Sequence, residues 1–147
     1  MVAKLFKLMV IVTMLLVSAI MSAQMKRVIA YQSTPRSVTK YVEVYECDYV
    51  DVQPQFPGGE VALVEYINNQ RRYPVDAYSS NIQGRVLCSF VVNEDGSISH
   101  ATIIRGVEPS LNQEALRLIS EMPRWEAGKV ANRSVPVHYI LPIVFRK

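Results

Sequence analysis

The stretch FPGG, from Phe56 to Gly59, has the composition of a loop that could bind a phosphate. A P-loop, however, also ends in Gly-Lys followed by Ser or Thr, and its lysine reaches the phosphates. Here Gly59 is followed by Glu60, whose carboxylate would repel an anion. We therefore interpret FPGG as a helix entry, where the glycines turn the chain and Glu60 complements the helix dipole.

Other residues that could do chemistry form no recognisable catalytic or metal-binding pattern. His100 and His138 are the only histidines, and neither belongs to an HExxH motif or a Cys/His cluster. Both fall outside the clear apolar alternation, so we expect them to be solvated. No GxSxG elbow is present. Most acids on or beside one predicted helix are expected on its polar side: Glu108, Glu114, Glu121 and Glu126. We predict no enzyme activity, no cofactor and no metal.

Three residues allow more than one interpretation. Trp125 lies just past an amphipathic helix, so we favour a core position over a ligand platform. Cys47 and Cys88 could form a disulfide in an oxidising compartment. Each could equally be a small buried hydrophobic residue, and the sequence leaves the pairing open.

The N-terminus has the pattern of a secretory signal peptide. Lys4 and Lys7 precede an apolar run, Leu8–Ala23, and polar sequence begins at Gln24. We predict residues 1–23 as a signal peptide cleaved after Ala23. The alternative is an uncleaved anchor, although the run is shorter than the roughly 20 residues that span a bilayer. Either topology exports the rest of the chain.

Charge argues against a nucleic-acid partner. Loss of Lys4 and Lys7 would lower the formal net charge from +3 to +1. Beyond Arg71-Arg72 no basic run stands out, so we expect no nucleic-acid binding. The 147 residues suffice for one domain with an ordinary core.

Periodicity predicts an extended segment and then a helix in the first half. Residues 24–40 are polar and read as a tether. Tyr41–Val52 is rich in β-formers and is expected to be extended, with a break at Glu46–Asp48. From Glu60 to about Asn69 the spacing is helical, and the apolar residues are Val61, Leu63, Val64 and Ile67.

The second half predicts a hairpin, a helix and a strand. Arg85–Val92 alternates, Asn93–Gly96 is a turn, and the return strand follows. Glu108–Met122 carries a continuous apolar stripe. Ser134–Phe145 also alternates, and its two prolines favour a sheet edge. The expected fold is α+β: two helices on one face of a three-stranded antiparallel sheet, preceded by an extended N-terminal segment. Buried residues should include Phe90, Leu118 and Trp125.

Several stretches, in this order, resemble the C-terminal domain of TonB-type energy transducers in the form common among Bacteroidetes-like bacteria. They are FPGG with its helix, RRYP, IQGRVLCSFVVNEDGSI, IIRGVEPSLNQEALRLISEMPRWEAGK and VPVHYILPIVF. The resemblance covers roughly residues 50–147. It implies the same fold, and it implies that FPGG is a recurring helix entry.

The resemblance also implies a binding function. Domains of this family capture a short peptide, the TonB box, of an outer-membrane TonB-dependent transporter, and the peptide adds as a strand to an open sheet edge. The edge is the last strand, which here matches Ser134, Val135, Pro136, Val137, His138 and Tyr139. A Tyr-Pro element and the residues before it also touch the box and plug: Gln70, Arg71, Arg72, Tyr73 and Pro74.

The resemblance stops short of the N-terminal region. Full transducers carry a histidine in their anchor and a long Pro-rich spacer, and neither is found in Leu8–Ala23 or in residues 24–49. We therefore expect a periplasmic peptide-binding module at 50–147. The alternative is a minimal transducer, held in the inner membrane by a single pass with its domain facing the periplasm, that engages an inner-membrane proton-channel complex. An open edge would also permit a strand-paired homodimer.

Overall fold

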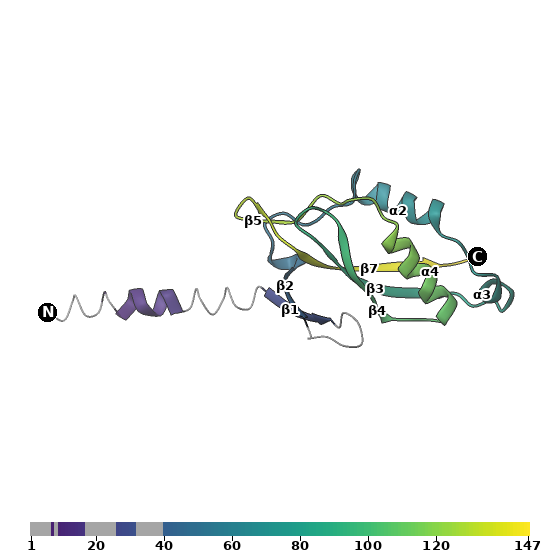
Figure 1. Cartoon of the computed structure of the whole chain (residues 1–147), viewed down its shortest axis with the longest axis horizontal. Coiled ribbons are helices and arrows are strands. Elements are labelled where there is room, and N and C mark those ends of the chain that lie inside the picture. The colour runs from purple at the N-terminus through teal and green to yellow at the C-terminus, as the bar shows by residue number, and fades with distance from the viewer. Residues whose placement is uncertain (1–6, 8, 17–25, 32–39) are drawn as a thin grey trace.

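A mixed sheet with helices on one face forms the body of the protein (Figure 1). The computed structural model describes residues 7, 9–16, 26–31 and 40–147. The five-stranded sheet has the order β1-β2-β7-β3-β4, and a two-stranded ribbon pairs β5 with β6. The strands are β1 Lys26–Tyr31, β2 Lys40–Glu46, β3 Gly84–Val92, β4 Ile98–Arg105, β5 Lys129–Val130, β6 Arg133–Ser134 and β7 Val137–Phe145. The helices are the 3-10 turn η1 Cys47–Tyr49, α2 Gly59–Gln70, α3 Val75–Ser79 and α4 Pro109–Ser120.

The predicted antiparallel hairpin and final strand are adjacent in the sheet, with β7 in the middle, β3 beside it and β4 at one edge. β3 pairs antiparallel with β4, and β7 pairs with the other side of β3 from Val92↔Val137 to Gly84↔Phe145. Alternation explains the burial, because successive side chains of a strand point to opposite faces. The side chains that face the helices are buried or nearly so: Val86, Cys88, Phe90, Val92, Leu141, Ile143 and Phe145.

The helices α2 and α4 pack on that same face (Figure 1). The stripe of α4 is confirmed, with Leu111, Ala115, Leu118 and Ile119 buried. In α2, Leu63 and Ile67 are buried, but Val61 and Val64 are 72% and 51% exposed. The helix predicted from the spacing of these four residues is confirmed, and only one narrow side of it meets the core.

The FPGG stretch is a helix entry, as predicted. Gly58 caps α2 in the left-handed region at φ 86°, and Gly59 follows at φ 83°. Such angles are readily adopted only by glycine. A Cβ on Gly58 would also lie 2.9 Å from the Cβ of Ala62. Glu60 stands in the first turn, where its charge complements the helix dipole.

The predicted core residues are confirmed. Phe90 and Leu118 are fully buried, and Trp125 is 4% exposed. The Trp125 ring lies 5.5 Å from Phe90, 5.7 Å from Phe56 and 5.0 Å from Tyr139, centroid to centroid. These contacts join the β3–β7 pair to the segment that leads into α2.

The N-terminal region holds more regular structure than its sequence suggests. Lys26–Tyr31, expected to belong to a tether, forms β1 and pairs antiparallel with β2. The predicted break at Glu46–Asp48 is confirmed, since β2 ends at Glu46 and η1 follows. β2 then pairs parallel with β7 at Tyr45↔Val137 and Glu46↔His138. The α+β class is confirmed, but the sheet has five strands instead of three and one parallel pair.

The predicted signal or anchor falls mostly outside the described residues. Residues 9–16 are helical, and residues 17–25 are not described. Among the helices that are described, none combines the length and the apolar composition needed to cross a bilayer.

Candidate functional site

The outer side of β7, opposite β3, is where the structure brings functional candidates together. In a strand, the N–H and C=O of one residue point to the same side, and the side alternates along the chain. The carbonyl of Pro136 accepts a hydrogen bond from the N–H of Tyr45 at 2.9 Å. The carbonyl of Val144 accepts one from Nη1 of Arg71. The even-numbered residues of β7 therefore direct their backbone groups away from β3.

The first half of the predicted edge, Ser134–His138, is already paired within the chain. Ser134 belongs to the β5–β6 ribbon, and the N–H of Val135 donates to the carbonyl of Gly128 at 2.9 Å. Val137 and His138 lie opposite β2, and they are 0% and 5% exposed. The expected solvated position of His138 was therefore wrong. Its Nδ1 lies 3.3 Å from Oε2 of Glu46, and its carbonyl accepts from Sγ of Cys47.

The second half of β7 has no strand on its outer side within the part of the chain that the structure describes. The β2 pairing ends at His138, because η1 turns the chain away there. By alternation, Ile140 points its N–H and C=O outward, and its side chain is 47% exposed. Pro142 has no N–H to offer, which limits pairing there. The open edge is thus Ile140–Val144.

The predicted contact segment Gln70–Pro74 lies at the far end of this edge. Arg71 caps α2 and binds the Val144 carbonyl, and its guanidinium lies 5.9 Å from the Phe145 ring centroid. Tyr73 is half-buried, in edge-to-face contact with Tyr78 and Phe145. Pro74 caps α3. Arg71 is therefore the residue of this segment that reaches the outer backbone edge of β7, whereas Tyr73 packs against the Phe145 side chain on the core.

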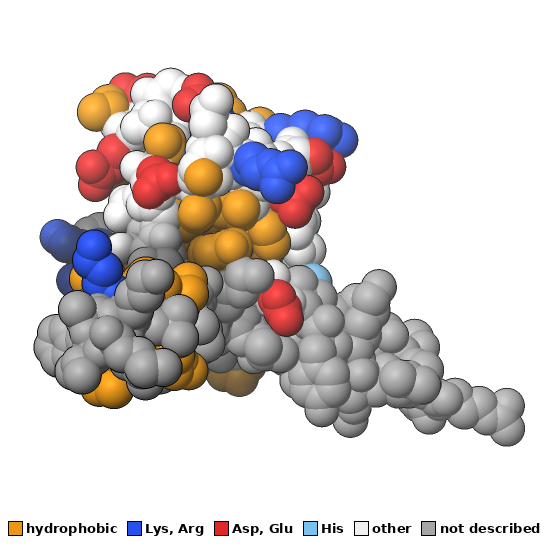
Figure 2. All heavy atoms as spheres, turned by 90° about the vertical axis from the view of Figure 1, so that its left-hand side faces the viewer, with side chains coloured by type: hydrophobic (Ala, Val, Ile, Leu, Met, Phe, Trp, Pro, Cys, Tyr) orange, Lys and Arg blue, Asp and Glu red, His pale blue; other side chains and the backbone are white. Residues whose placement is uncertain are grey.

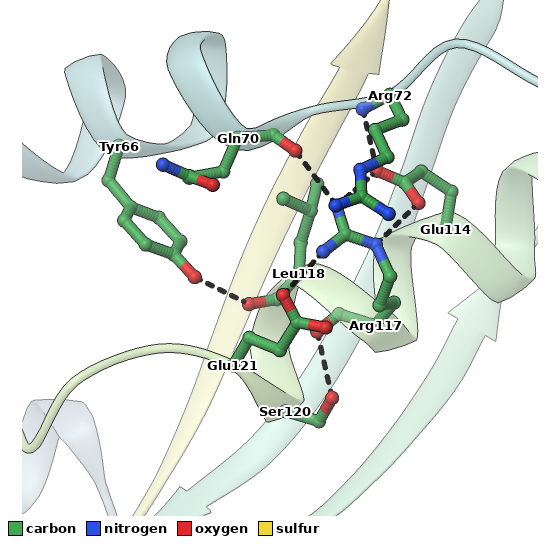
Figure 3. A network of polar contacts seen from close by, with 8 residues as sticks. All are labelled: Tyr66, Gln70, Arg72, Glu114, Arg117, Leu118, Ser120 and Glu121. Atoms are coloured by element: carbon green, nitrogen blue, oxygen red, sulfur yellow. Dashed lines mark hydrogen bonds and ion pairs between the residues drawn. The ribbon is translucent and has the colours of Figure 1, made fainter.

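A polar network fixes the chain at the end of α2 (Figure 3). Glu114 on α4 accepts a hydrogen bond from the backbone N–H of Arg72 at 2.7 Å. Arg117 pairs with Glu114, also at 2.7 Å, and donates to the Gln70 carbonyl at 2.8 Å. Burial by itself would raise the pKa of Glu114, but the hydrogen bonds from Arg117 and Arg72 outweigh it and lower that pKa. The network holds Gln70–Arg72 in place beside β7.

Glu114 contradicts its sequence-based placement. It was expected on the polar side of its helix with the other acids, yet it is only 8% exposed. It is buried where α2 ends, and its carboxylate accepts hydrogen bonds there from the backbone N–H of Arg72 and from the guanidinium of Arg117. A buried carboxylate is tolerated when it is fully paired in this way.

Two hollows lie between α2 and β7, one at each end of the open edge. The first encloses about 520 Å³ and is lined by Asp51, Val52, Gln53, Pro54, Gln55, Glu60, Leu63 and Tyr139. The second encloses about 260 Å³ and is lined by Asn68, Arg71, Val144 and Arg146. The charged side chains that line the first are acidic, and those that line the second are basic.

Nucleophilic chemistry has no support at this site. Burial, followed by the charges of Asp48 and Glu46, raises the pKa of the Cys47 thiol to about 11. Burial raises that of Cys88 to about 11 as well. Both cysteines are free, and both thiols stay protonated at neutral pH. The described residues also include no group of three His, Cys, Asp or Glu that could hold a metal ion.

Sequence reasoning placed the whole strand Ser134–Phe145 at a sheet edge, whereas β7 is the third of five strands and only part of its outer side is open. It did not name Ile140, Pro142 and Val144 as binding residues, and it missed Asp51 and Glu60 as their neighbours. Alternation along β7 could have identified the outward-facing set once its pairing with β3 was known. Nothing local to Asp51 or Glu60 signals their place beside Tyr139, because that depends on how the two segments pack.

Among the described residues, the structure is an α+β sheet that has an open strand edge beside a helix. The chain matches the sequence model of the Gram-negative bacterial TonB protein C-terminal family over residues 69–146, and it belongs to that family. Members of the family are non-catalytic, periplasmic domains that interact with outer-membrane TonB-dependent transporters in energy transduction.

Two solved structures resemble the chain. One is an NMR solution structure of Helicobacter pylori TonB-CTD, residues 194–285, which is 27% identical and has a TM-score of 0.46. The match covers 58% of this chain and 90% of that one. The other is the Helicobacter pylori TonB-CTD, residues 179–285, which is 28% identical, has a TM-score of 0.47, and is matched over 59% and 78% of the two chains. No curated protein matches the chain.

Proposed function

We propose that the chain is a periplasmic, exported module that binds a TonB-box-like peptide of an outer-membrane transporter by strand addition. The observation that carries the proposal is the open edge of β7: from Ile140 to Val144 no described strand lies on its outer side, although the Val144 carbonyl already accepts from Arg71. A peptide strand there would gain affinity from backbone hydrogen bonds and selectivity from alternate side chains.

The position of the edge also supports the proposal. α2 runs alongside it from Glu60 to Arg71, and the network around Glu114 holds the end of that helix. A helix already held in place beside a strand edge lowers the entropic cost of binding, because only the peptide must lose conformational freedom. Of the predicted contact residues, Tyr139 and Arg71 lie at the two ends of this edge.

The covered half of β7 is a second element of the proposal. β2 already uses this edge as a parallel partner, at Tyr45↔Val137. The outer side of β7 can therefore pair with an added strand, and a bound peptide would continue along β7 from the point where the β2 pairing ends. The predicted residues Ser134–His138 then hold β7 in place through their pairing within the chain, and the peptide itself contacts Tyr139–Val144.

The test is titration of the folded chain with labelled peptides taken from the plug ends of co-expressed outer-membrane transporters. Ile140→Pro removes the outward N–H without touching the β3 pairing, and we expect it to weaken binding by about tenfold or more. Ile140→Thr keeps the N–H and is the matched control, with an expected change below about threefold. Circular dichroism checks that both variants fold.

A peptide change provides an independent readout if Ile140→Pro does not fold. Methylation of alternate amide nitrogens of the peptide removes its donors and leaves the protein untouched. Equal affinity of the methylated and unmethylated peptides in both alternation patterns would contradict strand addition. A peptide that binds Ile140→Pro as tightly as it binds the unchanged protein would place the site elsewhere.

A further inference from the structure

The open edge of β7 lies between two patches of opposite charge. At the Tyr139 end, Asp51 and Glu60 line the larger hollow. At the Val144 end, Arg71 and Arg146 line the smaller one. The middle is apolar, with Val64 on α2 and Ile140 on β7 both about half exposed. Figure 2 views the molecule from the side on which β5 lies in Figure 1, and on that face a group of hydrophobic side chains has both acidic and basic side chains beside it.

Charges at both ends remain available to a partner. Glu60 and Arg146 are exposed and form no ion pair with another described residue. Asp51 is exposed, and one of its oxygens accepts from the N–H of Ala131 at 2.6 Å. Arg71 donates from Nη1 to the Val144 carbonyl, and the other N–H groups of its guanidinium are left for a partner. A guanidinium has five N–H donors, so it can bind a carboxylate in addition.

We propose that the edge selects an extended peptide that carries a cationic side chain at one end and an acidic side chain at the other. The cation would lie against Asp51 and Glu60, and the acid against Arg71 and Arg146. This inference rests on the proposed function and names the chemistry of its partner. The peptide's middle residues would be apolar or β-branched, to match Val64 and Ile140.

Strand geometry sets the spacing of the two charges. Tyr139 and Val144 are separated by about 17 Å along a strand that rises about 3.4 Å per residue. Glu60 lies in the first turn of α2 and Arg71 is its C-cap, so the two peptide side chains must project to the same face. Same-face side chains recur at every second residue, so the peptide's charges stand about four or six residues apart.

The test uses three labelled peptides with the same apolar centre. They are Lys-Lys-Val-Thr-Val-Glu-Glu, its charge-reversed partner Glu-Glu-Val-Thr-Val-Lys-Lys, and a neutral form with glutamine at every charged position. At low ionic strength we expect one charged order to bind about tenfold tighter than the other, with the neutral form between them. The preferred order also reports whether the peptide runs parallel or antiparallel to β7.

A protein with altered charges at the two ends of the edge tests whether those charges cause the preference for one peptide order. The pair E60K and R146E leaves one charge of each sign at either end and keeps the net charge of the protein, so we expect the preference to fall below about threefold. The pair E65K and R105E places the same changes on exposed positions of α2 and β4, and it should keep the full preference. Added salt should shrink the preference in the unchanged protein, since exposed charges are screened.

The results distinguish failure of the charge selection from failure of the proposed strand-addition site. Equal binding of all three peptides, lost in Ile140→Pro, would overturn the charge selection and leave the strand-addition site standing. A preference that survives E60K with R146E would also overturn it. Absence of binding by every peptide, including the transporter peptides, would instead contradict the proposed function itself.

Discussion

Trp125 joins three parts of the core at the residue scale. Its ring touches Phe56, Phe90 and Tyr139, and its Nε1 is buried without a hydrogen-bond partner among the described residues. We predict that Trp125→Ala lowers the free energy of unfolding by about 3–5 kcal/mol. Trp125→Phe should cost much less, because it keeps a ring and removes the unpaired donor.

Chemical denaturation of both variants measures the two costs. An unchanged midpoint in Trp125→Ala would mean that the indole belongs to the ligand surface instead of the core. A phenylalanine variant as unstable as the alanine one would mean that the Nε1 donor has a partner in solution.

Glu114 links stability to pH. Folding lowers its pKa below the ordinary value of 4.5. A lowered folded-state pKa gives a stabilisation that is fully present above the unfolded-state pKa and is lost as pH falls through the folded-state value. We predict that Glu114→Gln is less stable than the unchanged protein at neutral pH, and that the difference narrows as the pH is lowered through the acid range.

Denaturant titrations between about pH 7 and about pH 3 test this dependence. Glu121→Gln is the control, because the Glu121 side chain is 55% exposed and pairs with Arg117 at the surface. A gap between wild type and Glu114→Gln that stays constant over the whole range would show that hydrogen bonding, and not the charge of Glu114, stabilises this end of α2.

At the scale of elements, β7 has two sides that behave differently. Tyr139, Leu141 and Ile143 direct their N–H groups to β3, and His138 directs its own to β2, whereas Ile140 has no strand partner among the described residues. We predict that the Ile140 amide exchanges with solvent about 100-fold faster, or more, than the amide of Leu141. Amide hydrogen exchange followed by NMR checks this.

If the Ile140 amide exchanges slowly, repeating the measurement at several protein concentrations separates two explanations. Slow exchange that appears only at high protein concentration would indicate the strand-paired homodimer. Slow exchange at every concentration would contradict the open edge, and with it the proposed site.

The parallel pairing of β2 is the other feature at this scale. An exposed edge is a hazard for aggregation, and β2 shortens it from the N-terminal side of β7. Val44, which directly precedes the two paired residues Tyr45 and Glu46, is fully buried. The N-terminal segment therefore contributes to the fold of the domain, and of the outer side of β7 it leaves Ile140–Val144 without a strand partner among the described residues.

At the scale of the whole molecule, the fate of the N-terminus decides between the two topologies. We predict that the protein purified from its native cell begins at Gln24 and partitions into the soluble periplasmic fraction, because Leu8–Ala23 is shorter than a typical span. Intact-mass measurement of the purified chain identifies the first residue. An intact Met1 with membrane retention would favour the anchored transducer.

The sequence by itself determined the local elements and the family. The FPGG helix entry, the β3–β4 hairpin, the stripe of α4 and the apolar face of β7 all follow from residue spacing, because burial of one face imposes a period that neighbouring residues record. The ordered motifs identified the TonB C-terminal family, which the match over residues 69–146 shows.

The tertiary structure alone decided which part of β7 is open. Strand pairing is made through backbone groups, which are alike in every residue, so the sequence of β7 does not record whether β2, a peptide or water lies beside it. The burial of His138 and Glu114 depends on Glu46 and Arg72, each more than forty positions away in the chain. The opposite charges at the two ends of the edge likewise come from α2, the segment before it and the C-terminus, which meet only in the folded protein.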